Sequence, residues 1–90
     1  MAELRAAIDA LDARLVAMLA VRQTYIERAA VLKSERGTVR DTPRVEQVVR
    51  NVVAEAKRKG LSPAIAEAVW RSLIEASIAH EYKAFDAKAE

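Results

Sequence analysis

A long apolar stripe in the first third of the sequence restricts this chain to folds built from long helices. Its members recur in steps of four and three residues, which places them on one helix face: Leu4, Ile8, Leu11, Leu15, Met18, Tyr25, Ala29 and Leu32. A helix from about Ala2 to Glu35 would be a rod of roughly 50 Å. A 90-residue globule is narrower than this rod, so one chain alone could not cover it.

Two shorter helices are predicted after the rod. The expected boundaries are a break at Ser34 to Asp41 around Gly37, a second helix from Thr42-Pro43 to Gly60, and a third from Ser62-Pro63 to about Phe85. Thr42 and Ser62 are typical N-caps before a proline, and Gly60 is a typical stop signal. The second helix has an apolar face of Val45, Val48, Val49, Val52, Val53 and Ala56. With only two glycines, two prolines and no linker, residues 1–90 are expected to form a single all-α domain.

Composition excludes several classes of site. The chain has no cysteine, which rules out disulfides and thiol nucleophiles and fits a cytoplasmic location. A single histidine, His80, gives little support to a metal site. The longest apolar run, Leu15 to Val21, is too short to span a membrane, and the charged N-terminus predicts no signal peptide.

The charge pattern favours small anions over nucleic acids as partners. Fifteen basic and thirteen acidic residues are interspersed, and no basic stripe with stacking aromatics is present. Ten of the basic residues are arginines, whose planar guanidinium suits carboxylates and phosphates. Most of these arginines are expected to lie on a salt-bridged surface.

Two cations interrupt the apolar stripe of the first helix. Arg22 occupies the step after Met18, and Lys33 follows about 20° around and roughly 16 Å along the same helix. Two such side chains could clamp an anion, or they could pair with a core carboxylate or reach solvent. Arg5 lies roughly 25 Å and about 100° from Arg22, so it could join the same site only from a second chain.

The third helix also places polar residues on its apolar face. Ile74, Ile78, Tyr82 and Phe85 form the stripe, and Ser77 and Glu81 lie on it one turn apart. A serine there usually bonds a backbone carbonyl, whereas an ionised glutamate needs a cation. His80 lies beside the stripe and is interpreted as structural or surface-exposed.

These residues, in this order and spacing, resemble the all-helical chorismate mutase family. The resemblance runs from Leu4 to about Tyr82 and rests on Leu4-Arg5-x-x-Ile8-x-x-Leu11-Asp12-x-x-Leu15, Arg22, Lys33, Val39-Arg40-Asp41, Arg44 and Leu73-Ile74-Glu75-Ala76-Ser77. It implies an intertwined homodimer of three-helix chains in which the long first helices cross between two active sites. It also implies cofactor-free, metal-free rearrangement of chorismate to prephenate in aromatic amino-acid biosynthesis.

The resemblance assigns a role to each candidate site residue. By position, Arg22 and Arg5 of the partner subunit would clamp the carboxylates of the substrate, with Ser77 beside one of them. Lys33 would donate to the ether oxygen and to a carboxylate. Arg44 would lie near the ring carboxylate, and the backbone of Asp41 would help to bind the ring hydroxyl. Two positions depart from the best-known bacterial pattern. Val45 replaces a glutamate that contacts the ring hydroxyl, and Glu81 replaces a glutamine that donates to the ether oxygen. A glutamate can donate there only when protonated.

Two alternatives remain open at this point. Isochorismate pyruvate lyases resemble the mutases in fold and share the valine at position 45, although glutamine is common at their counterpart of Glu81. A non-catalytic helical dimerisation or regulatory module would explain the apolar stripe. It would leave Arg22, Lys33 and Glu81 unexplained.

Overall fold

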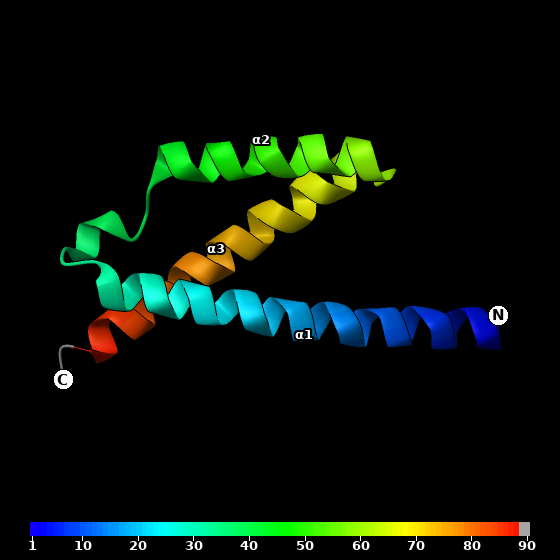
Figure 1. The fold of residues 1–90 in the computed structure, drawn as a ribbon, viewed down its shortest axis with the longest axis horizontal. Coiled ribbons are helices and arrows are strands. Elements are labelled where there is room, and N and C mark those ends of the chain that lie inside the picture. The colour runs from blue at the N-terminus through cyan, green and yellow to red at the C-terminus, as the bar shows by residue number, and fades with distance from the viewer. Residues whose placement is uncertain (89–90) are drawn as a thin grey trace.

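The chain folds into three α-helices joined in series (Figure 1). The computed structural model describes residues 1–88. Helix α1 spans Ala2–Leu32, α2 spans Thr42–Lys59 and α3 spans Pro63–Ala87, and a short 3₁₀ turn, Arg36–Thr38, lies between α1 and α2. No strand occurs in the described part of the chain. The predicted all-α fold with one long and two shorter helices is therefore confirmed.

The caps around the α2–α3 turn are those the sequence predicts. Gly60 ends α2 in the left-handed region, with φ of 79°, a backbone conformation that glycine adopts without a Cβ clash. The side chain of Ser62 accepts a hydrogen bond from the backbone nitrogen of Ile65 at 3.4 Å and so begins α3. These two residues fix a tight connection between antiparallel neighbours.

Three predicted boundaries are wrong by one to three residues. Helix α1 ends at Leu32 rather than Glu35, because Lys33 already has an extended backbone. The N-cap of α2 is Asp41 and not Thr42, since the Asp41 carboxylate accepts a hydrogen bond from the backbone nitrogen of Arg44 at 3.1 Å. The third helix continues past Phe85 to Ala87.

Helix α3 lies between the other two helices and packs against both (Figure 1). Its buried residues Ile74 and Ile78 meet Val39 and Val49 in the core, and the partly buried side chains around them are Val45, Val48, Val53, Trp70, Tyr82 and Phe85. The apolar faces predicted for the second and third helices are therefore the faces that pack together.

The first half of α1 is exposed along its whole length. Every residue from 1 to 21 is exposed, and the N-terminal part of α1 extends well past the start of α3 (Figure 1). In the second half, Tyr25 and Leu32 are 70% and 69% exposed although they belong to the predicted stripe, and Ile26 and the buried Ala30 lie closer to α3. A straight helix turns about 20° per heptad against a strict seven-residue repeat, which accounts for this shift.

The molecule is extended for its size. It measures 50 × 26 × 15 Å and has a radius of gyration of 15.6 Å, where a compact 90-residue domain would have about 12 Å. Its accessible surface is 6794 Å², about 1,600 Å² more than a compact monomer of this mass exposes. The predicted rod therefore exists, and α3 covers only part of it.

Candidate active site

A pocket of about 410 Å³ lies where the end of α1, the start of α2 and the middle of α3 meet. This volume falls within the usual range for small-molecule sites. Its apolar walls are Ile26, Ala29, Val39, Val45, Val48, Ile74 and Ile78, and its polar groups are Arg22, Lys33, Asp41, Arg44, Ser77 and Glu81. Every candidate site residue named from the sequence lines this pocket except Arg5.

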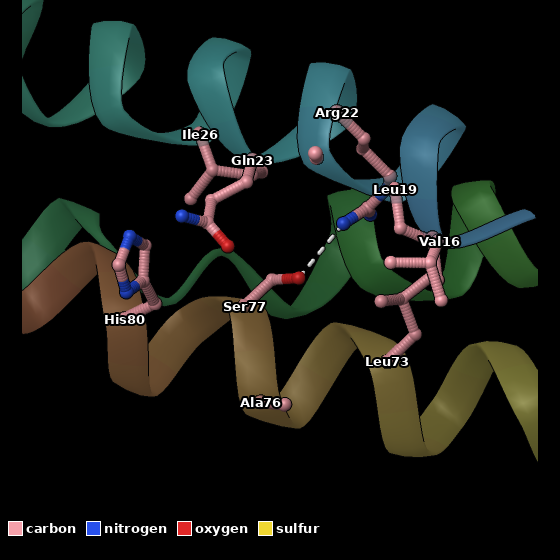
Figure 2. A pocket seen from close by; sticks show the side chains of 10 residues that line it. Val16, Leu19, Arg22, Gln23, Ile26, Leu73, Ala76, Ser77 and His80 are labelled. Atoms are coloured by element: carbon pink, nitrogen blue, oxygen red, sulfur yellow. Dashed lines mark hydrogen bonds between the residues drawn. The ribbon is translucent and has the colours of Figure 1, made fainter. Parts of the chain in front are cut away.

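Arg22 lies at the boundary between this pocket and a second groove that opens between α1 and α3 (Figure 2). Its guanidinium points from α1 to α3 and donates a hydrogen bond from Nη1 to Ser77 Oγ at 2.7 Å. Ser77 thus accepts from a side chain of another helix. Partial burial lowers the pKa of Arg22 below its ordinary value by desolvation. A guanidinium has five N–H donors, so donors remain for a ligand in the pocket.

Lys33 and Glu81 form an ion pair inside the pocket. The distance from Lys33 Nζ to Glu81 Oε2 is 2.6 Å, and Glu81 is only 5% exposed. A buried carboxylate requires a cation or a donor, and the residue just past the end of α1 supplies it. Of the alternatives that the sequence left open for Lys33, pairing with a core carboxylate is the one observed. Lys33 also lines the pocket.

The start of α2 supplies the other two polar groups. The capping bond from Arg44 nitrogen to Asp41 fixes the first turn of the helix, and this fixes where the Arg44 side chain leaves it. The Arg44 guanidinium donates to Gln47 Oε1 at 2.8 Å on the exposed side. Val45, the next residue, presents only apolar atoms to the pocket. Because Asp41 is the N-cap, position 45 lies one residue too far along to complete a capping box.

Arg5 lies outside this arrangement. It is exposed near the free end of α1, roughly 25 Å along the helix from Arg22. The pocket of one chain is therefore lined by three cationic side chains, and Arg5 of the same chain is too far along α1 to reach it.

His80 lies outside the pocket, in the second groove (Figure 2). Its Nε2 lies 2.7 Å from Glu27 Oε2, and this hydrogen bond holds the pKa of Glu27 below its usual range. No cluster of three or more metal-ligating side chains occurs within residues 1–88. Over the same residues, none of the helices combines the length and apolar character needed to cross a bilayer.

Sequence reasoning missed the contacts that hold the α1–α2 connection on α3. Arg40 forms a two-fold hydrogen-bonded pair with Glu75, at 3.0 and 2.7 Å. Arg36 pairs with Asp86 at 2.9 Å. These partners are 35 and 50 residues apart, so no local pattern in the sequence could reveal them.

Fold and pocket together define a class: an all-helical protein with a small-molecule site whose cations suit a ligand bearing carboxylates. Comparison with family models sharpens this class, because the model for chorismate mutase type II matches residues 4–82 of the chain. The chain belongs to the chorismate mutase type II family, whose members are isomerases that convert chorismate to prephenate. Neither the curated proteins nor the solved structures yield a match.

Proposed function

We propose that this chain is a chorismate mutase whose active site is the pocket between α1, α2 and α3. One observation carries the proposal: Arg22, Lys33 and Arg44 converge on one pocket in a chain of this family, although they come from different segments. Chorismate is a dicarboxylate, so a pocket with several cations and apolar walls matches both its charges and its ring. The cytoplasm is the compartment we propose for it.

The reaction breaks a C–O bond and forms a C–C bond within one substrate molecule, so the site needs no nucleophile. Its task is to hold the flexible dicarboxylate folded, which proximity and orientation can accelerate strongly. Arg22 and Arg44 bind the two carboxylates in this proposal, with Ser77 beside one of them. Ser77 already holds Arg22 at 2.7 Å, which reduces the freedom that the guanidinium must lose on binding.

Lys33 and Glu81 act where charge develops. As the C–O bond breaks, negative charge grows on the ether oxygen, and a preorganised donor there stabilises the transition state more than the ground state. Lys33 is that donor, and its bond to Glu81 directs it into the pocket. Glu81 can add a second hydrogen bond to the oxygen only in its protonated form, because an ionised carboxylate only accepts.

Recognition of the ring hydroxyl falls to the backbone at Asp41 in this proposal. The Asp41 side chain is committed to capping α2, and Val45 offers no hydrogen-bonding group. A site without a side-chain acceptor discriminates weakly between substrates that differ at this hydroxyl. Isochorismate therefore belongs in any assay of this protein.

We further propose that the enzyme is a homodimer and that Arg5 of the partner subunit completes each site. Each chain leaves about 1,600 Å² of excess surface, an amount typical of one side of an obligate dimer interface. The bare first half of α1 carries both the uncovered leucines and Arg5. In the proposed dimer a twofold axis covers this half and brings Arg5 to the other chain's pocket.

The direct test is an assay of the purified protein by the loss of chorismate absorbance, repeated with isochorismate. We expect chorismate turnover, and we expect Arg22→Ala to lose at least about 3 kcal/mol of transition-state stabilisation, roughly 150-fold in kcat/KM. Arg28→Ala is the matched control, because Arg28 is an exposed arginine on the same helix away from the pocket. An Arg22→Ala variant as active as Arg28→Ala, or turnover of isochorismate alone, would contradict the proposal.

A further inference from the structure

The end of α1 is capped by a side chain from near the C-terminus of the chain. Lys88, just past α3, donates from Nζ to the carbonyl oxygens of Ala30 at 2.7 Å and Val31 at 3.3 Å, and also to that of Lys33. The same ammonium lies 4.2 Å from the centre of the Phe85 ring. The lysine side chain is therefore held by three acceptors and by one aromatic face.

These carbonyls need such a partner. The last four C=O groups of a helix accept no hydrogen bond from the N–H groups of the same helix. A cation near them also offsets the negative C-terminal end of the helix dipole. Helix α1 has no basic residue in its last turn and no glycine cap. Its own backbone uses Ala29 O, which accepts from Lys33 nitrogen at 3.0 Å. Lys88 therefore supplies the cationic cap that the sequence of α1 does not contain.

Helix α3 and its C-cap residue Lys88 consequently hold Lys33 at two points. Glu81 binds its ammonium at 2.6 Å, and Lys88 binds its carbonyl oxygen. Glu81 and Lys88 are seven residues apart, two turns of one helix, so they face the same side about 10 Å from each other. Between them they fix both the backbone and the side chain of the residue that faces the pocket.

We propose that Lys88 is a positioning residue for Lys33. By capping α1 it keeps the extended backbone at Lys33 in place, and this directs the ammonium to Glu81 and to the reacting ether oxygen. Lys88 itself does not touch the substrate. The inference rests on the proposed function, because Lys33 matters to catalysis only if the pocket is the mutase site.

The test compares Lys88→Met with Lys83→Met in the full-length protein. Methionine retains the length and apolar stem of lysine without its donor, and Lys83 is an exposed lysine on α3 that lines none of the pockets described above. We expect Lys88→Met to lower kcat for chorismate about tenfold with a smaller change in KM, because a misplaced donor weakens the transition state most. Lys83→Met should retain wild-type kinetics, and Lys88→Arg should recover part of the loss.

Two further measurements separate positioning from general destabilisation. Amide hydrogen exchange should become roughly tenfold faster in the last turn of α1 of Lys88→Met, with the α2–α3 core unchanged. In a Lys33→Gln background, Lys88→Met should cost little further activity, because the residue it positions is already absent. Equal losses in both backgrounds, or unchanged exchange at the end of α1, would overturn the inference.

Failure of this inference can be distinguished from failure of the proposed function. If wild-type protein converts chorismate and Lys88→Met matches Lys83→Met, the positioning role is wrong and the mutase assignment stands. If wild-type protein does not convert chorismate, the function is wrong, and the hydrogen-exchange comparison still decides whether Lys88 caps α1.

Discussion

The two halves of α1 are both rich in apolar residues and have different surroundings. From Arg22 onward the helix lies along α3, Ala30 is buried, and Arg22 and Lys33 each have a partner on α3. From residue 1 to 21 every residue is exposed, including leucines that are about half accessible. One continuous helix therefore lies beside α3 at its C-terminal end and projects beyond α3 at its N-terminal end (Figure 1).

This contrast shows what an apolar stripe encodes. It predicts that apolar residues of the helix will be covered. It does not say by which chain, and Tyr25 and Leu32 stay exposed although they belong to the stripe. The covered half of α1 uses helix α3 of its own chain, and every residue of the bare half stays exposed within the described residues. The proposed dimer removes the difference between the two halves, so experiments that separate them test the dimer directly.

The largest expected effect comes from a charge in the bare half. Leu11→Glu places a carboxylate at the centre of the uncovered stripe, where it would be buried twice in a twofold dimer. We expect it to abolish dimerisation and activity, with at least about 3 kcal/mol lost per chain, the cost of truncating a core leucine alone. Sedimentation and circular dichroism measure the assembly and the helix content.

Ala10→Glu is the control for this substitution, because Ala10 is an exposed neighbour about 100° around the helix from Leu11. It adds the same charge to the other side of the rod and should retain the dimer. An active Leu11→Glu monomer would show that the bare half needs no cover. It would contradict the inference that a 90-residue chain with so long a helix requires a second chain.

A smaller effect, but a more specific one, is expected when two inactive variants are mixed. Arg5→Ala and Arg22→Ala should each lose about 100-fold or more in kcat/KM, since each removes a charged donor. A heterodimer of the two variants has one site with both arginines and one site with neither. After unfolding and joint refolding, random pairing should restore about a quarter of wild-type activity.

The mixing result distinguishes the two possible origins of Arg5. If Arg5 acted in its own chain, every site in the heterodimer would lack one arginine and nothing would be restored. Refolding each variant alone is the control, and it should give no recovery. Absence of recovery in the mixture, with dimers present by sedimentation, would contradict a shared site.

Most of the fold and the pocket could be predicted from the sequence, and the exceptions have one cause. Arg22 and Glu81 were identifiable because a charge on an apolar face conflicts with a local pattern. The role of Lys88 was not identifiable, because its acceptors are backbone carbonyls 55 to 58 residues away. Every residue has a backbone carbonyl, so no sequence pattern marks these acceptors. The cap of α2 was assigned to Thr42 instead of Asp41 for a related reason, since both residues can cap and only the local backbone decides between them.

Beside the covered half of α1, Glu81 of α3 is buried within its own chain. The charged groups around it are Arg22 and Lys33 from α1 and its end, and Asp41 and Arg44 from the start of α2. If protonated Glu81 donates to the ether oxygen, kcat should fall as the pH rises, by up to about tenfold per pH unit once the carboxylate is ionised. Glu81→Gln donates at every pH, so its kcat should vary little between pH 5 and 9.

The shape of the profile also separates two roles of Glu81, a proton donor to the ether oxygen and a support for Lys33. Glutamine can still accept from Lys33, so Glu81→Gln removes the ionisation and retains the hydrogen bond that orients the ammonium. A flat variant profile beside a falling wild-type profile assigns the pH dependence to the covered end of the site. Parallel profiles would mean that Glu81 serves only to hold Lys33 through the hydrogen bond at 2.6 Å.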